Sequence, residues 1–224
     1  MKSTIKIEKT AIIGAGSWGT ALAKLLGDKG KTLYLWGHDS GRMEEMASSR
    51  VNSKYLAGHR LADSIKVTSE LEVVGECQCV VMVIPSHGYR EVFRKLVSLL
   101  TADCLVVSAV KGIENDSLQT MTQIMAEEIA KRPDKGKNIR LGVLSGPSFA
   151  EEVATEQPTA VTVAFADNDA AYAVQELFST QFFRTYTSED VIGLEISAAM
   201  KNVIAIAAGI CDGLRYGLNT RAAL

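Results

Sequence analysis

The sequence predicts an α/β protein: a Rossmann-like, doubly wound and mostly parallel sheet, followed by the start of an all-helical C-terminal domain. Three observations lead to this class. A glycine-rich turn links an apolar strand to a helix near the N-terminus, apolar strands then alternate with helices over short links, and the alternation stops near Ser188. Such alternation is typical of parallel sheets with helices on both faces. We therefore expect a sheet domain over residues 1–188 and the first part of a helical domain over residues 189–224.

The predicted strands and helices follow one another regularly along the chain. After a strand at residues 10–13 and a helix at residues 20–26, the periodicity of the apolar residues predicts the remaining elements. Strands are expected at residues 32–36, 67–68, 79–84, 104–110, 140–144, 159–165 and 182–186, and helices at residues 40–49, 118–131, 149–154, 168–179 and 190–210, with a further helix after Ser86 and a weakly helical run at residues 70–77. Polar residues 51–64 predict a loop, and charged residues 133–137 predict a turn.

The glycine-rich turn that begins at Gly14 has the spacing G-x-G-x-x-G and lies between a strand and a helix. In this context Gly14 permits the tight turn, Gly16 lets the backbone approach a pyrophosphate, and Gly19 lets the helix pack closely on its strand. The free N–H groups and the positive dipole end of the helix favour an anion. Ser17 adds a hydroxyl and Trp18 an apolar wall. We therefore expect a dinucleotide-binding domain, with a purely structural turn as the alternative.

The residue that meets the adenosine ribose is expected about twenty positions beyond the glycine turn, near His38. An acid at the tip of the second strand favours NAD, but Asp39 lies just past that tip. His38, Arg42 and Arg50 are alternatives that would meet the 2′-phosphate of NADP. From the residues alone the cofactor is NAD or NADP, and the choice between them stays open.

Composition argues against several other classes of function. The net charge is −2, with acidic and basic residues mixed along the chain, so no basic surface indicates a nucleic-acid partner. Four cysteines without a C-x-x-C pair and three scattered histidines predict no metal site, and the cysteines are expected to be buried and unpaired. No apolar run is expected to reach the roughly eighteen residues of a membrane span, and no signal peptide is visible. We expect a cytoplasmic protein.

Ligands of an open α/β sheet bind beyond the carboxyl ends of its strands. Besides the glycine turn, three apolar strands end in candidate segments at residues 84–87, 109–112 and 144–148, and we expect these segments to converge near the nicotinamide half of a dinucleotide. Lys111 is a cation at the tip of a buried strand, followed by a glycine that gives a ligand room. The alternative is an ordinary surface lysine at a strand end.

Lys201 lies in a helical run that is apolar on nearly all sides, which predicts a buried helix. Desolvation lowers the pKa of a buried lysine, and a lysine with a lowered pKa can serve as a base near neutral pH. Lys111 nearby would lower this pKa further, whereas Glu195 would raise it. A lysine that reaches solvent from the edge of the helix is the alternative.

The residues that carry these features resemble the NAD(P)-dependent glycerol-3-phosphate dehydrogenases, from the first strand to Leu224. The similar segments are GAGSWGTA (14–21), LWGHD (35–39), IPSH (84–87), KGIE (111–114), SGPSFA (145–150) and KNVIA (201–205), with residues 209–213 and 219–223 also alike. The resemblance implies an NAD(P)H-dependent, reversible reduction of dihydroxyacetone phosphate to sn-glycerol 3-phosphate, a precursor of phospholipids. A homodimer is expected for the full-length form.

By position, the resemblance also implies a role for individual residues. Lys201 is the implied proton acceptor for the C2 hydroxyl of glycerol, and Lys111 the implied contact to cofactor and substrate that polarises the carbonyl group. Gly146 and Ser148 are implied substrate contacts. The implied cofactor contacts, besides Lys111 and the glycine turn, are Ser17, Trp18, His38 and Ala150.

Two departures from the family pattern qualify the resemblance. Ser197-Ala198 stands where many members carry two glycines, and members continue well beyond Leu224 through segments that close over the substrate phosphate. We therefore expect the 224-residue chain to bind a dinucleotide but to turn over poorly. The alternatives are a non-catalytic redox sensor, which the two lysines disfavour, and a related two-domain dehydrogenase for a hydroxy acid or sugar acid, which the Ser-Gly-Pro-Ser and Lys-Asn sequences disfavour.

Overall fold

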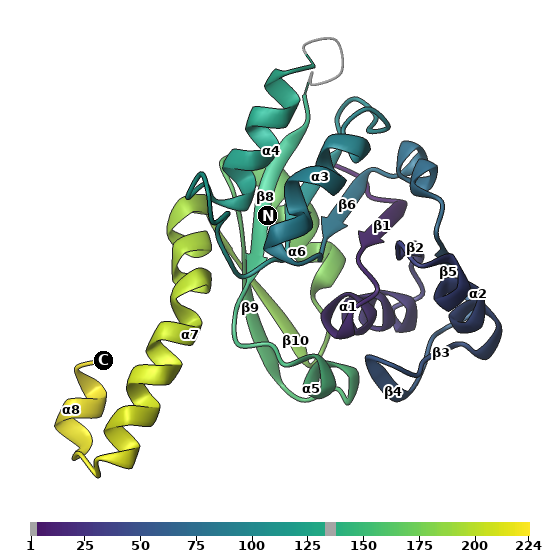
Figure 1. Ribbon diagram of the computed structural model, residues 1–224. Coiled ribbons are helices and arrows are strands. Elements are labelled where there is room, and N and C mark those ends of the chain that lie inside the picture. The colour runs from purple at the N-terminus through teal and green to yellow at the C-terminus, as the bar shows by residue number, and fades with distance from the viewer. Residues whose placement is uncertain (1–3, 133–137) are drawn as a thin grey trace.

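A computed structural model describes residues 4–132 and 138–224 of the chain. Its centre is an eight-stranded sheet with the strand order β10-β9-β8-β7-β6-β1-β2-β5 (Figure 1). All neighbouring strands of this sheet run parallel except β8 and β9. The expected doubly wound, mostly parallel sheet is therefore confirmed. The strands are β1 (Lys9–Ile13), β2 (Thr32–Trp36), β5 (Ile65–Thr68), β6 (Cys79–Met82), β7 (Leu105–Ser108), β8 (Arg140–Ser145), β9 (Thr159–Phe165) and β10 (Phe183–Ser188).

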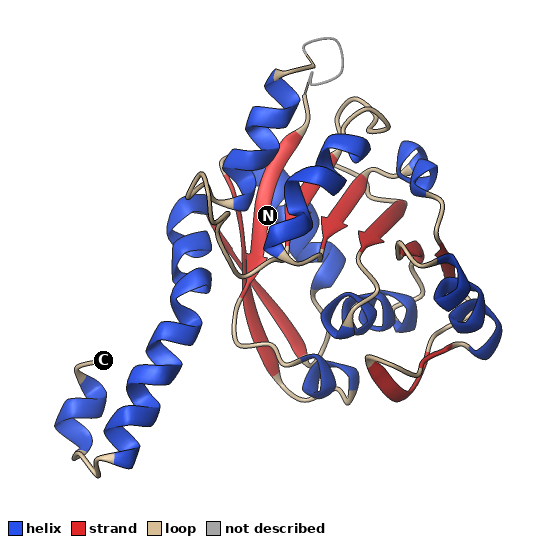
Figure 2. Cartoon of the chain, viewed as in Figure 1, coloured by secondary structure: helices blue, strands red, loops and turns tan. Residues whose placement is uncertain are grey.

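Helices cover both faces of the sheet (Figure 2). Successive residues of a strand point to opposite faces, so Ile12 joins the core under α1, α5 and α6, and Ile13 joins the core under α3 and α4. The apolar runs predicted as central strands are buried along the whole of β6 and β7. The helices are α1 (Ser17–Asp28), α2 (Ser40–Ser49), the 3₁₀ helix η1 (Leu71–Glu76), α3 (Ser86–Leu96), α4 (Met121–Ala130), α5 (Ala150–Ala154), α6 (Asn168–Phe178), α7 (Val191–Gly213) and α8 (Leu218–Ala222).

The polar segment predicted as a loop at residues 51–64 contains a small antiparallel hairpin instead, formed by β3 (Val51–Asn52) and β4 (Leu56–Arg60). The prediction of a loop was wrong because most side chains of β4 face solvent, so its sequence lacks the apolar pattern of a strand. A buried asparagine at the start of the hairpin connects it to the glycine turn. The charged turn predicted at residues 133–137 lies outside the described residues.

The long helix α7 is mostly exposed, although its apolar sequence predicts burial. Only Glu195, Ala198 and Cys211 are buried along it, and Ile206 is 65% exposed. Figure 1 shows α7 leaving the edge of the sheet domain, with α8 folded back beside its far end. An apolar sequence predicts burial only where another element covers the helix, and the described residues supply partners mainly in β8, β9 and α8.

This helix also corrects the expectation about apolar runs. With 23 residues, α7 is long and apolar enough to cross a membrane by length and composition alone. A single helix that meets this criterion is weak evidence for a membrane span, because the core helix of a soluble protein can meet it as well.

Candidate functional site

The glycine turn between β1 and α1 is shaped by backbone contacts that exclude side chains. Gly14 has φ +124°, and a Cβ atom there would lie 2.3 Å from the carbonyl oxygen of Val83. A Cβ atom at Gly19 would lie 1.8 Å from the carbonyl oxygen of Gly14. At Gly16, by contrast, a Cβ atom would meet nothing within 4 Å, so packing within the chain does not explain a glycine at this position. Close approach of a ligand does explain it.

The N-terminus of α1 is open toward the same space. Gly16 is the N-cap residue, and no side chain caps the free N–H groups of the first turn. The turn itself is supported from below by a chain of buried hydrogen bonds: Asn52 Nδ2 donates to Thr20 Oγ1 (2.8 Å) and to the carbonyl oxygen of Ala15 (3.0 Å), and Thr20 Oγ1 donates to the carbonyl oxygen of Gly16 (2.7 Å). An uncapped N-terminus on a rigid support suits an anionic group.

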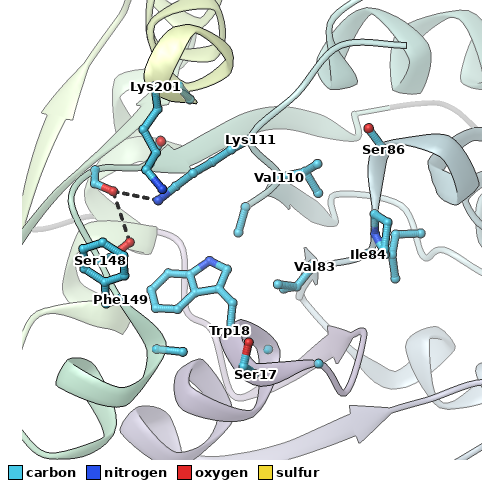
Figure 3. Close-up of a pocket in the computed structure, with 18 of the residues that line it drawn as sticks. Ser17, Trp18, Val83, Ile84, Ser86, Val110, Lys111, Ser148, Phe149 and Lys201 are labelled. Atoms are coloured by element: carbon cyan, nitrogen blue, oxygen red, sulfur yellow. Dashed lines mark hydrogen bonds between the residues drawn. The ribbon is translucent and has the colours of Figure 1, made fainter. Parts of the chain in front are cut away.

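A cleft of about 960 Å³ lies over the carboxyl ends of β1, β6, β7 and β8. The four strand-end segments therefore converge as the sequence predicts, and α7 closes one side (Figure 3). Most of the residues predicted for the site line this cleft: Gly16, Ser17, Trp18, Gly19, Lys111, Gly146, Ser148, Ala150 and Lys201. Two predicted residues do not line it: Gly14 is buried beneath the turn, and His38 is exposed at the end of β2.

Lys111 extends across the cleft toward the loop after β8 (Figure 3). Its Nζ donates to the carbonyl oxygen of Gly146 (3.0 Å), which also accepts from Ser148 Oγ (3.1 Å). Partial desolvation, and secondly the nearby ammonium group of Lys201, lower the pKa of Lys111. Among the described residues no carboxylate pairs with either lysine, so an anionic ligand would meet two uncompensated positive charges.

Lys201 reaches down from α7 to the same point as Lys111 (Figure 3). Its Nζ lies 5.3 Å from the ring centroid of Phe149, an attractive cation–π distance. The side chain comes from an exposed helix, so the predicted burial of Lys201 was wrong and the alternative of a lysine at the helix edge describes it better. The carboxylate of Glu195 forms its hydrogen bonds with Thr122 on α4 and makes no ion pair with Lys201.

The end of β2, where the adenosine ribose is expected, is polar. The Asp39 carboxylate caps α2 by accepting from the backbone N–H of Arg42 (3.1 Å), and the Arg42 guanidinium lies 4.7 Å from the ring centroid of Tyr55. Arg50 donates to the carbonyl oxygen of Ala62, so its guanidinium is turned away from this edge. Arg42 and His38 are therefore the two residues that remain at this edge from the three that the sequence proposed.

Several residues of the site were not found from the sequence. Phe149 lies between two predicted contacts, and its place beneath Lys201 depends on how α7 crosses the cleft. The apolar walls include Ile84 and Val110, which lie in the predicted segments 84–87 and 109–112. Val83, one residue before the first of these segments, and Leu194 and Ile204 of α7 were not predicted. Asn52 carried no signal, since it lies in a segment predicted as a loop.

The cysteines behave as the sequence predicts. All four are buried and unpaired, and burial raises the pKa of the thiols of Cys77 and Cys104 to about 12. Thiols with such a pKa stay protonated and unreactive at neutral pH. Within residues 4–132 and 138–224 no three His, Cys, Asp or Glu side chains form a group that could hold a metal ion.

The sheet order, the glycine turn and the cleft at the carboxyl ends of the strands define a Rossmann-type, dinucleotide-fold protein. Within that class the chain belongs to the NAD-dependent glycerol-3-phosphate dehydrogenase family: the model of the family's N-terminus matches residues 9–171, and the model of its C-terminus matches residues 190–224.

Individual relatives agree with the family models. A protein of Desulfotalea psychrophila named glycerol-3-phosphate dehydrogenase (NAD(P)+) is 57% identical over 96% of this chain and 63% of its own length. The crystal structure of glycerol-3-phosphate dehydrogenase from Coxiella burnetii matches with a TM-score of 0.84 at 36% identity, over 96% of this chain and 64% of that one. A sugar dehydrogenase of Pyrococcus horikoshii, named for UDP-D-ManNAc, shares only the fold, with a TM-score of 0.70 at 14% identity. The chain spans about 64% of the length of the curated relatives it matches.

Proposed function

We propose that this chain carries the cofactor site and the reacting lysines of a dehydrogenase that reduces dihydroxyacetone phosphate to sn-glycerol 3-phosphate with NADH or NADPH, reversibly. The observation that carries the proposal is the meeting of Lys111 and Lys201, without a carboxylate partner among the described residues, in a cleft that begins at an uncapped helix N-terminus. A dianionic phosphate ester beside a dinucleotide matches that charge distribution.

The residues present fit a dinucleotide. The open space above Gly16 and the uncapped first turn of α1 suit the pyrophosphate, with the hydroxyl of Ser17 and the ring of Trp18 at the same turn. Ala150 lines the same cleft. At the end of β2, His38 and Arg42 are placed to meet the adenosine end, and Arg42 suits the 2′-phosphate that distinguishes NADP from NAD.

When bound, a reduced nicotinamide supplies a hydride, which would add to C2 of the ketone. The residues of this chain account for the rest of the reaction. Lys111 would donate a hydrogen bond to the C2 oxygen as negative charge develops there, and Lys201 would transfer its proton to that oxygen to give the alcohol. In the reverse direction Lys201 would accept this proton. Gly146 and Ser148 would contact the substrate from the loop after β8.

Other expectations remain predictions that follow from the same proposal. We infer a dinucleotide-binding domain over residues 1–188 and the first part of a helical substrate domain over residues 189–224; the end of β10 at Ser188 and the start of α7 at Val191 support this boundary. A homodimer, a cytoplasmic location and the absence of nucleic-acid and membrane partners are predicted for the full-length form.

Cofactor binding can be tested on the 224-residue chain itself. Titration with NADH or NADPH should quench the fluorescence of Trp18. Trp36 is replaced by Phe, so that Trp18 is the one tryptophan that gives a signal. A stronger response to NADPH that disappears in Arg42→Ala would assign the preference to Arg42. No saturable response to either cofactor would contradict the cofactor site.

The substrate is tested on full-length protein by following NAD(P)H oxidation. Dihydroxyacetone phosphate should be reduced, whereas dihydroxyacetone and hydroxy-acid precursors without phosphate should not. Preference for a phosphate-free substrate would favour the related two-domain dehydrogenases. Cofactor binding without turnover of any of these substrates would favour the hypothesis of a non-catalytic redox sensor.

A further inference from the structure

Glu195 makes an unusual contact for a charged residue on a helix that is otherwise mostly exposed. Its side chain is 3% exposed, and its two carboxylate oxygens accept from the backbone N–H (2.9 Å) and from the hydroxyl (2.5 Å) of Thr122. Thr122 lies in the first turn of α4, so the N–H that Glu195 accepts is one that no bond inside α4 can satisfy. Glu195 therefore caps α4 from a different helix, 73 positions along the chain.

This contact lies on the part of α7 that borders the cleft. The residues of α7 that line the cleft recur at helical spacing and form one stripe: Leu194, Ser197, Ala198, Lys201 and Ile204. Glu195 lies beside the start of this stripe and Lys201 near its end. Because successive residues of a helix are rotated by about 100°, a slip of one residue at Glu195 would turn Lys201 out of the cleft.

The rest of α7 offers little else to fix this rotation. Besides Glu195, only Ala198 is buried in the half of the helix that approaches the sheet, and the cleft-facing positions around it are small or partly exposed. Apolar contacts between small side chains tolerate sliding, whereas a carboxylate with two directed hydrogen bonds does not. The buried charge is compensated by two donors at the positive end of α4.

We infer that Glu195 is a positioning residue: by capping α4 through Thr122, it fixes the rotation of α7 that places Lys201 beside Lys111. This inference rests on the proposed function of Lys201. It predicts that the Glu195–Thr122 contact affects the proton-transfer step and leaves cofactor binding unchanged, because both hydrogen bonds of Glu195 go to Thr122 and the glycine turn is held by Asn52 and Thr20.

The test compares four single variants and one double variant of the full-length protein by kcat, by KM for both substrates and by thermal unfolding. Glu195→Ala should lower kcat by about a hundredfold, and Thr122→Val, which keeps the backbone N–H but loses the hydroxyl, by about tenfold. Thr122→Ser and Glu195→Gln keep an acceptor–donor pair and should stay closer to the wild type. KM for NAD(P)H should not change in any of them. The double variant Glu195→Ala, Thr122→Val should be no slower than Glu195→Ala alone, because one contact is removed in both.

A purely stabilising role for Glu195 predicts a different outcome. The unfolding temperature of Thr122→Val would fall while its kcat, corrected for the folded fraction, stayed at the wild-type value, and that result would overturn the inference. Thr122→Val keeps this test possible even if Glu195→Ala does not fold.

A second readout separates failure of this inference from failure of the proposed function. If the wild-type protein does not reduce dihydroxyacetone phosphate, the pKa of Lys111 is followed instead by NMR of ¹³C-methylated lysines, with Lys111→Arg for assignment. Loss of the Glu195–Thr122 contact should raise the pKa of Lys111 as far as Lys201→Met does, since each change removes the ammonium group of Lys201 from beside Lys111. An unchanged pKa of Lys111 in Glu195→Ala and Thr122→Val would overturn the inference.

Discussion

The cleft and the flank formed by α3 and α4 use the same groups in opposite ways. In the cleft, Lys111 and Lys201 have no carboxylate partner among the described residues, and the N-terminus of α1 has no side-chain cap. On the flank, Arg90 of α3 is surrounded by carboxylates, and the N-terminus of α4 is closed by a capping box and by Glu195. The same chain thus contains both an open and a closed arrangement of cations and helix ends.

The flank shows what full compensation looks like. The Arg90 guanidinium donates to Glu114 (2.7 Å), Glu127 (2.9 Å) and Glu128 (2.9 Å), and also to Gln119 (2.8 Å). Glu128 is 2% exposed, so this network satisfies a buried charge and ties α3, α4 and the segment after Lys111 together. All three nitrogen atoms of the guanidinium group donate hydrogen bonds to side chains of the same chain.

The difference between the two regions indicates which of them binds a ligand. Paired charges and capped helix ends are satisfied within the chain and contribute to stability. Unpaired charges and an uncapped helix end raise the free energy of the unliganded protein, and an anionic ligand removes that penalty. Substitutions of the unpaired groups in the cleft should therefore change binding and turnover, whereas substitutions in the Arg90 network of the flank should change stability.

The largest expected effect follows replacement of Lys201 by Met in the full-length protein. Loss of the proton-transfer group should lower kcat by at least about a thousandfold, with cofactor affinity and unfolding temperature unchanged. Lys201→Arg is the matched control, because it keeps the charge over Phe149 but does not release a proton near neutral pH. Near-normal turnover in Lys201→Met would remove this residue from the mechanism.

Replacement of Arg90 by Met should have the next largest effect, this time on stability. It removes the cation that Glu114, Glu127 and Glu128 share, and Arg94 and Lys131 then remain to pair with Glu128. The free energy of unfolding should fall by about 3 kcal/mol. Urea unfolding measures this, and Arg94→Ala is the control, since Arg94 is 53% exposed and should contribute less than about 1 kcal/mol. Equal losses in the two variants would show that the network is not centred on Arg90.

Two glycines of the same turn should separate binding from folding. Gly16→Ala places a methyl group in open space, so the fold should persist while the dissociation constant for NAD(P)H rises by about thirtyfold, or 2 kcal/mol. Gly19→Ala forces its Cβ to within 1.8 Å of a carbonyl oxygen and should prevent normal folding. Circular dichroism and cofactor titration distinguish the two. Unchanged cofactor affinity in Gly16→Ala would place the pyrophosphate elsewhere.

The smallest expected effect is the response of the flank to acid. Hydrogen bonds from Arg90 and Ser117 hold the pKa of Glu114 at about 2, and bonds from Arg94, Lys131 and Arg90 hold that of Glu128 at about 2, against 4.5 for a free carboxylate. The unfolded state then binds more protons, so the stabilisation is present above pH 4.5 and is lost as the pH falls toward 2. We expect a loss of about 1 to 2 kcal/mol for the two groups together.

This acid dependence is measured by urea unfolding at a series of pH values between 2 and 6. Arg90→Met provides the comparison, because without the guanidinium group Glu114 regains a more ordinary pKa, while Arg94 and Lys131 still lower the pKa of Glu128, so the slope should flatten in part. The same slope in both proteins would assign the acid sensitivity to other carboxylates.

The sequence predicted the fold and most of the cleft. Gly19 is required by a backbone contact with Gly14 inside one strand–turn–helix unit, and Gly14 by its positive φ of +124°, so local sequence spacing identifies the turn. Parallel strands end at the same edge of the sheet, so the positions of Lys111 and Gly146 along their own strands were enough to bring them together. Such features depend on short segments and on a topology that few alternatives can replace.

The tertiary structure alone decided the contacts between distant segments. The pairing of Glu195 with Thr122, the exposure of α7, the support of the glycine turn by Asn52 and the network of Arg90 all depend on which side chains of remote segments meet. The physical reason is that a periodic pattern specifies which face of an element is apolar, but a directed hydrogen bond depends on the rotation and position of two elements at once. Most residues of the cleft could therefore be predicted from the sequence. The orientation of Lys201 could not, because it depends on how α7 packs on α4 through Glu195 and Thr122, which lie 73 positions apart in the chain.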